Sequence, residues 1–126
     1  MLASATAIAF LPSSDLDRSR RFFADVLGLA PQEMTPFACV LRAGSTMLRV
    51  TKVDDLRVQP FTVFGWQVPD IRGSVAHLTG AGVAFVRYDG IDQDADGIWT
   101  TPGGDRVAWF TDPDGNTLSL TQFAAG

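Results

Sequence analysis

One pattern occurs twice in the sequence, and this internal repeat limits the possible folds more than any other feature does. A strand pattern is followed by a helix pattern that begins at Ser14 or Asp15, and a shift of 55 residues takes Asp15 to Asp70, where a second helix pattern begins. The same shift takes Leu16 to Ile71, so the helix starts and the apolar helix faces align together. The sequence therefore predicts two copies of one α+β unit.

Each copy continues with strands after its helix. The strand patterns lie at 6–11, 37–43 and 46–53 in the first copy and at 61–68, 83–89, 106–110 and 117–123 in the second. Residues 89–105, which are polar and rich in glycine, have no counterpart in the first copy, and we interpret them as a surface flap or functional loop rather than a disordered tail. We predict a single domain over residues 1–126, with βαβββ modules at about 5–56 and about 60–123.

The composition excludes several classes of function. A formal charge of −4 without any stripe of Lys and Arg argues against binding to nucleic acid or to an anionic membrane. The single cysteine, Cys39, excludes an internal disulfide and a cysteine cluster for zinc, and it suits a reducing cytosol. The apolar start of the chain lacks the positive region of a signal peptide, and no apolar run approaches the roughly 20 residues that span a bilayer. We expect a cytoplasmic protein.

Three segments resemble a known superfamily. The segment SSDLDRSRRFFADVLGL, the repeated unit and the ending AWFTDPDGNTLSL resemble the vicinal oxygen chelate superfamily over residues 6–123. That superfamily includes glyoxalase I, extradiol dioxygenases, methylmalonyl-CoA epimerase, fosfomycin resistance enzymes and bleomycin resistance proteins. The resemblance implies two βαβββ modules that form a curved, cup-shaped mixed β-sheet, the glyoxalase/bleomycin resistance/dihydroxybiphenyl dioxygenase fold. It also implies a homodimer, which the apolar composition permits.

The resemblance can be followed to the metal ligands. Metal-dependent members carry four inward ligands, usually His, Gln or Glu, on the first and last strands of each unit. The corresponding positions in this sequence are Ile8, Arg49, Val63 and Ser119. Two are aliphatic, one is a permanent cation and a lone serine hydroxyl is a weak donor, so none suits a divalent ion. The only histidine, His77, lies in the second helix pattern, and we expect neither a metal nor another cofactor.

The segment Asp112-Pro113-Asp114-Gly115 has an alternative interpretation as part of a calcium loop. Pro113 presets its own φ angle, Gly115 tolerates a positive φ, and the aspartates can accept hydrogen bonds from nearby backbone amides, which is typical of a turn between strands. A calcium loop needs more oxygen ligands and a bidentate glutamate downstream, and the sequence has none. We therefore predict a turn.

Alternation along the strands predicts which side chains share the face away from the helices. We expect Phe64, Trp66, Val68, Leu118 and Leu120 to face the helices as core. Arg49 on the opposite face requires either an anionic or carbonyl-bearing ligand or a structural partner among Asp54, Asp55 and Glu33, and both interpretations stay open. Together with Trp99 from the 89–105 loop, the predicted ligand pocket comprises Ile8, Phe10, Met47, Arg49, Val63, Gln67, Trp99, Ser119 and Thr121.

An apolar pocket with few polar groups is typical of small-molecule binding. The first hypothesis is a metal-independent binding protein that sequesters a drug or metabolite, as the bleomycin resistance proteins do, with Trp99 and Trp109 stacking on a planar ligand. The alternative is a lyase, isomerase or dioxygenase with a non-standard or absent metal site, although no general base is evident on this face, and its catalytic residues would be unknown. A third possibility is an accessory domain whose cup is filled by a partner chain.

Overall fold

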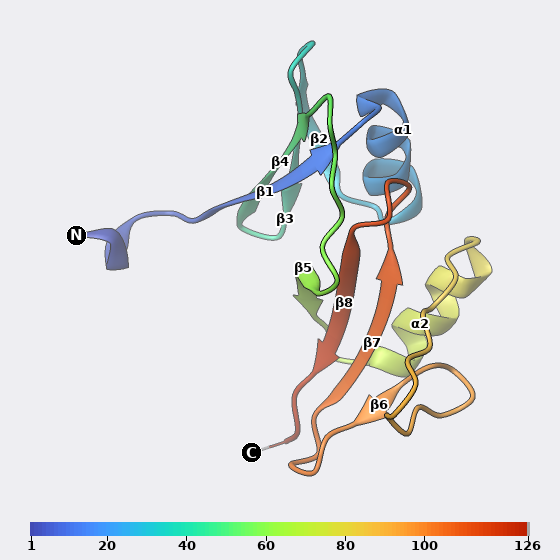
Figure 1. Ribbon diagram of the computed structural model, residues 1–126. Helices are drawn as coiled ribbons and strands as arrows, with labels where there is room; N and C mark the ends of the chain where they lie inside the picture. Colours follow the sequence, from blue (N-terminus) through green and yellow to red (C-terminus); the bar gives the residue numbers. More distant parts are fainter. Residues whose placement is uncertain (126) are drawn as a thin grey trace. The chain divides into compact units, whose positions relative to one another are not determined.

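The computed structural model describes residues 1–125, and the chain divides into two compact units, Met1–Val58 and a second that begins at Gln59 (Figure 1). Within the described part, no helix is long and apolar enough to cross a membrane. Each unit contains its own four-stranded sheet and its own helical segment.

The first unit has one helical region and one mixed sheet. Its strands pair in the order β1-β4-β3-β2, with β1 parallel to β4 and the other pairs antiparallel. Its elements in chain order are a 3₁₀ turn at Leu2–Ser4, β1 (Ile8–Ser13), α1 (Leu16–Arg20), the π-helix η2 (Arg21–Val26), β2 (Ala30–Met34), β3 (Ala38–Ala43) and β4 (Thr46–Lys52).

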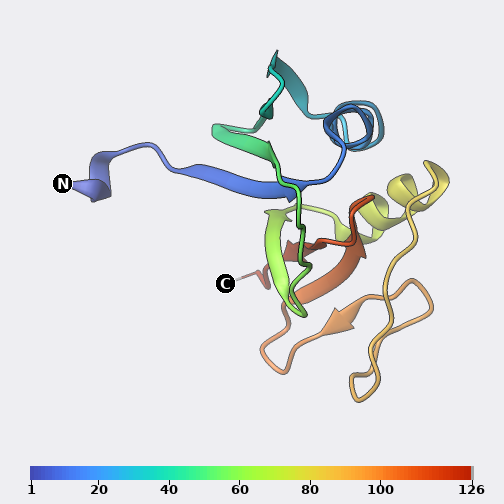
Figure 2. The ribbon, with the colours of Figure 1, turned by 45° about the horizontal axis from the view of Figure 1, so that its top comes forward.

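The second unit repeats this strand order as β5-β8-β7-β6, again with the neighbouring strands β5 and β8 parallel. Its helix packs against β7 and β8 (Figure 2). Its elements are β5 (Thr62–Gln67), α2 (Ile71–Gly80), β6 (Trp99–Thr100), β7 (Arg106–Thr111) and β8 (Thr117–Gln122). Two α+β modules with the same strand order confirm the predicted fold class.

The helix starts of the two units match, as the repeat predicts. The Asp15 carboxylate accepts a hydrogen bond from the Arg18 amide at 3.1 Å, and the Asp70 carboxylate accepts one from the Gly73 amide at 3.1 Å. Such bonds satisfy amides that have no partner inside the first helical turn. Asp15, rather than Ser14, is therefore the first N-cap.

The first helix differs from the prediction in its second half. After Arg20 the backbone continues as a π-helix, in which the Leu27 amide bonds to the Phe22 carbonyl at 3.0 Å. A π-helix has more residues per turn than an α-helix, so the 3.6-residue spacing no longer places the apolar residues on one face. Phe23 is fully buried while Phe22 is only partly buried and packs edge-on against it.

Alternation gives each sheet one buried face. On the second sheet, Leu118 and Leu120 are buried on the side that α2 covers, as predicted. Phe64 and Trp66 are half-buried and pack edge to face at 4.9 Å between ring centroids. The corresponding core of the first unit consists of Leu11, Phe23, Cys39, Leu41, Leu48 and Val50.

The predicted strand at 83–89 is wrong. Only Phe85 forms a β-bridge there, with Phe110 on β7, and the Val86 amide bonds to the Trp109 carbonyl at 2.7 Å. The other half of the β7 edge pairs with β6, which comes from the predicted loop. The Tyr88 amide bonds to the Gln93 side chain instead of to β7, so the backbone leaves the sheet at this point.

Candidate functional site

The predicted pocket residues of the first unit lie on the sheet face away from the buried core. Phe10 on β1 stands in register with Arg49 on β4, and Ile8 stands in register with Met47. Phe10 is 64% exposed and Ile8 is 47% exposed. Leu11, which follows Phe10 on β1 and points to the opposite face, is buried. The face therefore combines apolar side chains with two permanent cations, Arg49 and Arg42, the second of which is in register with Met47.

Arg49 is partly buried, and its side chain forms no hydrogen bond or ion pair with residues 1–125. Two of its predicted partners are engaged elsewhere: Asp54 pairs with Lys52 at 3.5 Å and Asp55 with Arg57 at 3.2 Å. Glu33 lies in the same row of the sheet, with Val40 between it and Arg49. The guanidinium group is thus available to a ligand on this face.

The open face of the second sheet is built from two neighbouring rows. One row consists of Gly65, Ser119 and Trp109, and the other consists of Gln67, Thr121, Val107 and Trp99. Neither row contains a titratable side chain. Of the predicted pocket residues in this unit, Val63 is the exception, because it lies at an irregularity in the pairing of β5 with β8 and has no partner in register.

Gly65 keeps the surface beside Ser119 low. A Cβ atom at residue 65 would lie 2.5 Å from Ser119 Oγ and 2.9 Å from the Ser119 carbonyl oxygen, distances that a real side chain does not tolerate. The absence of a side chain at Gly65 lets the small Ser119 side chain lie close to the Gly65 backbone, and Trp109 follows Ser119 in the same row.

Three aromatic side chains, Tyr88, Trp99 and Trp109, form what we call the aromatic cluster. The Trp99 and Trp109 rings are stacked, with centroids 6.2 Å apart and planes 26° from parallel. The Tyr88 ring meets Trp109 edge-on, with centroids 5.3 Å apart. The sequence predicts Tyr88 within a strand and does not indicate it as a site residue. Nothing in the polar sequence that follows Tyr88 indicates that its ring packs against Trp109.

The side chains at the metal-ligand positions do not fit a divalent cation. The strand register sets Phe10, rather than Ile8, opposite Arg49, and Gly65, rather than Val63, opposite Ser119. With either choice, only the Ser119 hydroxyl could donate an electron pair to a metal ion. Arg49 is a permanent cation, and the other two side chains have no ligand atom. Over residues 1–125, no three His, Cys, Asp or Glu side chains come close enough to hold a metal ion. We therefore derive no chemistry through a metal.

The Asp112–Asn116 segment is a turn between β7 and β8. Asp112 is only 4% exposed, and its Oδ1 accepts hydrogen bonds from the amides of Asp114 at 3.0 Å and Asn116 at 2.9 Å. Its Oδ2 accepts from Asn116 Nδ2 at 2.8 Å, and Gly115 has a φ of 92°. Burial raises the pKa of Asp112 and outweighs these hydrogen bonds, which lower it. Both carboxylate oxygens serve the turn, so the predicted turn is confirmed.

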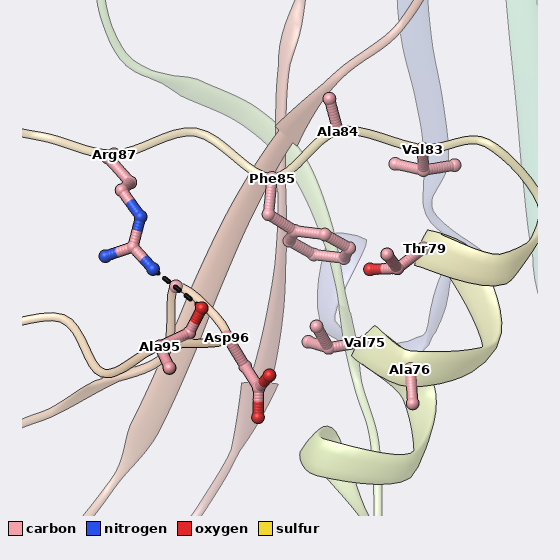
Figure 3. A pocket seen from close by; sticks show the side chains of 10 residues that line it. Val75, Ala76, Thr79, Val83, Ala84, Phe85, Arg87, Ala95 and Asp96 are labelled. Atoms are coloured by element: carbon pink, nitrogen blue, oxygen red, sulfur yellow. Dashed lines mark hydrogen bonds between the residues drawn. The ribbon is translucent and has the colours of Figure 1, made fainter.

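A hollow of about 490 Å³ lies in the second unit between α2 and the segment that follows it (Figure 3). Its walls include Val75 and Thr79 from α2, Phe85, and the residues Arg87 and Asp96 from the following segment. Phe85 packs on Phe110, which belongs to the buried face of the sheet, so the hollow is on the helix side. None of the nine residues of the predicted ligand pocket lines it.

Comparison with solved structures supports the same fold. A putative glyoxalase family protein from Bacillus anthracis matches with a TM-score of 0.75 at 13% identity, covering 96% of each chain. A glyoxalase/bleomycin resistance protein/dioxygenase superfamily member from Sphaerobacter thermophilus matches with a TM-score of 0.73 at 21% identity, covering 98% of this chain and 100% of that one. A glyoxalase/bleomycin resistance protein/dioxygenase from Alicyclobacillus acidocaldarius gives 0.72 at 17%, covering 97% and 93%.

At these identities the structural matches establish the fold alone, and no curated protein matches the sequence. The family model of the glyoxalase/bleomycin resistance protein/dioxygenase superfamily matches residues 5–120, which span both units. Fold and sequence model agree over nearly the whole chain. The protein belongs to the glyoxalase/bleomycin resistance protein/dioxygenase superfamily.

Proposed function

We propose that the protein is a metal-independent small-molecule-binding protein that takes up a planar ligand on the open face of its second sheet. The observation that carries this proposal is the aromatic cluster of Tyr88, Trp99 and Trp109 beside the low surface at Gly65 and Ser119. Sequestration of a drug or metabolite requires only such a surface and no chemical step.

The geometry of the cluster suits a flat ring system. Trp109 belongs to the same row as Ser119, and Trp99 belongs to the adjacent row, so the indoles border a patch of small side chains. Aromatic pairs contribute about 0.5–1.5 kcal/mol each beyond the burial of apolar area. Several such contacts on one ligand give useful affinity without any charged group in the patch.

The chemistry of the face favours binding over catalysis. The two rows of the second sheet offer the hydroxyls of Ser119 and Thr121 and the amide of Gln67 but no titratable group that could move a proton at neutral pH. Separately, Arg49 is available to an anionic or carbonyl group at the open face of its own unit, since its guanidinium has no partner within the described chain.

The proposal includes a cytoplasmic homodimer. Cys39 is a free thiol that is fully buried, which suits a reducing compartment. Phe37 and Phe61 are large apolar side chains that are 76% and 58% exposed, and contact with a second copy would remove such surface from water.

Native mass spectrometry of protein purified from its own host tests the proposal. It reports the number of subunits, any bound metal and any retained small molecule in one spectrum. We expect a dimer that carries no metal and retains a compound with a planar ring. Zinc, nickel, iron or manganese at one ion per subunit that survives dialysis would contradict the metal-independent proposal and favour a lyase, isomerase or dioxygenase.

A further inference from the structure

We infer that residues 88–98, which we call the strap, shape the aromatic site, and that Arg72 and Gln93 are positioning residues that hold the strap in place. The inference rests on the proposed function, because it concerns the same aromatic cluster. Neither residue touches the open face of the sheet. Each acts through the backbone that carries Tyr88 and Trp99.

The strap interrupts the edge of the second sheet. Before it, Phe85 pairs with Phe110 and the Val86 amide bonds to the Trp109 carbonyl. After it, Trp99 pairs with Val107. The chain therefore leaves the β7 edge at Trp109 and pairs with β7 again at Val107. Tyr88 at the start of the strap and Trp99 directly after it both pack against the Trp109 indole.

Gln93 ties the two ends of the strap together. Its Oε1 accepts a hydrogen bond from the Tyr88 amide at 2.7 Å. Its Nε2 donates to the carbonyl oxygens of Val86 at 3.0 Å and Gly97 at 2.8 Å. The backbone of Gln93 also forms a β-bridge with Trp99. One amide side chain thus fixes the distance between the leaving segment and the returning segment.

Arg72 ties the strap to α2. Its Nη2 donates to Asp94 Oδ2 at 2.9 Å, and its Nη1 pairs with Asp96 Oδ2. Asp94 in turn organises the strap, because its Oδ1 accepts from the amides of Asp96 at 2.9 Å and Ile98 at 3.0 Å. The strap therefore depends on one side chain for its position relative to the helix.

The packing beneath the strap is incomplete. The hollow of about 490 Å³ lies between α2 and the strap, lined on one side by Val75 and Thr79 and on the other by Ala95 and Asp96 (Figure 3). Arg87 spans part of this gap through hydrogen bonds to the Asp94 and Ala95 carbonyls at 2.7 and 2.8 Å. Because apolar packing is missing between α2 and the segment Ala95–Asp96, polar contacts hold this part of the strap, whereas Ile98 at its end is buried. Exposed ion pairs contribute little to global stability. Loss of Arg72 should therefore release the strap without unfolding the unit.

The test compares Arg72→Ala, Arg72→Lys and Gln93→Glu with Lys52→Ala. Gln93→Glu keeps the acceptor for Tyr88 but replaces the donor to two carbonyls with an anion. Lys52→Ala removes one positive charge and one exposed ion pair in the first unit, and so controls for charge. The readouts are near-ultraviolet circular dichroism, which reports the packing of Tyr88, Trp99 and Trp109, thermal unfolding, and tryptophan-fluorescence titration with anthracene-9-carboxylate.

We expect Arg72→Ala and Gln93→Glu to lose near-ultraviolet signal and to bind the probe about threefold to tenfold more weakly. The melting temperature of Arg72→Ala should fall by about 4 °C or less. Arg72→Lys should recover part of the signal, because a lysine can pair with one aspartate at a time. Lys52→Ala should match the unchanged protein in signal and affinity.

Unchanged near-ultraviolet signal and probe affinity in both Arg72→Ala and Gln93→Glu would overturn the inference. Cooperative unfolding of Arg72→Ala at room temperature would also overturn it, because Arg72 would then support the whole unit. If the spectra change as expected but the unchanged protein binds neither this probe nor a cationic one, the strap inference stands and the proposed function fails.

Discussion

The two units share one strand order but differ at the sheet edge and on the open face. In the first unit the edge strand β2 is continuous over Ala30–Met34 apart from one irregularity in pairing, and the open face carries one exposed ring, Phe10, together with aliphatic side chains and the cations Arg42 and Arg49. In the second unit the edge is interrupted by the strap, and the open face carries the aromatic cluster. The repeat therefore supplies the two sheets, whereas the departure of the strap from the sheet edge brings the aromatic cluster together.

The same contrast appears at equivalent positions within the sheets. The 55-residue shift takes Phe10 to Gly65, and both lie opposite the last strand of their unit, Phe10 facing Arg49 and Gly65 facing Ser119. One position holds a large exposed ring, whereas the other has no room for a single methyl group.

The largest expected effect on stability follows from this difference. Gly65→Ala should lower the free energy of unfolding by about 1–3 kcal/mol, because the new Cβ meets the Ser119 backbone and one strand must shift. Gly80→Ala at the end of α2 is the matched control, since its Cβ meets nothing within 4 Å and its φ is not positive. It should raise stability by up to about 1 kcal/mol.

Chemical denaturation measures both variants. Phe10→Ala should stay within about 0.5 kcal/mol of the unchanged protein, because the ring is 64% exposed. Equal effects of Gly65→Ala and Gly80→Ala would show that residue 65 has room for a methyl group, which contradicts the crowding beside Ser119.

A smaller effect concerns the charge of the ligand. Arg49 should bind an anion at the open face of its own unit, and Arg49→Ala should weaken that binding of anthracene-9-carboxylate by up to about fivefold, since an ion pair near the surface contributes at most about 1 kcal/mol. Binding of the cation 9-aminoacridine should stay equal or improve. Fluorescence titration with both probes decides the point. If affinity is unchanged for both while stability falls, Arg49 has the structural role that sequence analysis left open.

The smallest effect is a pH dependence of the strap. Burial acts to raise the pKa of Asp94, but hydrogen bonds from Arg72 and from the amides of Ile98 and Asp96 outweigh it and lower the pKa below its ordinary value of 3.8. A lowered pKa means that the charged carboxylate stabilises the folded strap above pH 3.8 and that this contribution is lost as the pH falls through the folded-state value.

Near-ultraviolet circular dichroism between pH 7 and acid should therefore show a loss of aromatic signal below pH 3.8, and Asp94→Asn should lack that step. Asp112 acts in the opposite sense, because its pKa is raised and its protonation at low pH favours the folded turn. A signal that falls only together with global unfolding would show that the strap has no separate acid transition.

Features of the sequence that depend on local chemistry were predictable. The caps at Asp15 and Asp70 and the turn at Asp112 each depend on a carboxylate that accepts a hydrogen bond from a nearby backbone amide. The repeat was visible because both caps and both apolar helix faces align at one shift of 55 residues. The open faces followed from alternation, because every second residue of a strand points the same way. The single-domain organisation, the pocket residues and the metal-free state stay predictions.

Features that depend on distant pairing were not predictable. The segment 83–89 has the composition of a strand, but β7 offers one edge, and β6 takes half of it. Tyr88 therefore joins the aromatic cluster through the path of the strap rather than through a strand pattern. The π-helix after Arg20 was also not predictable, because the apolar spacing indicates a regular helix, and it leaves Phe22 only partly buried beside the fully buried Phe23.

Metal-independent binding at the aromatic cluster can be tested by tryptophan-fluorescence titration with anthracene-9-carboxylate. The titration compares the unchanged protein with Trp109→Ala, each in the presence and absence of EDTA. Trp109 is the indole that both Tyr88 and Trp99 contact. The account predicts saturable binding that EDTA does not change and that Trp109→Ala weakens by about tenfold or more. Binding that EDTA abolishes, or that survives the loss of Trp109 at full affinity, would contradict it.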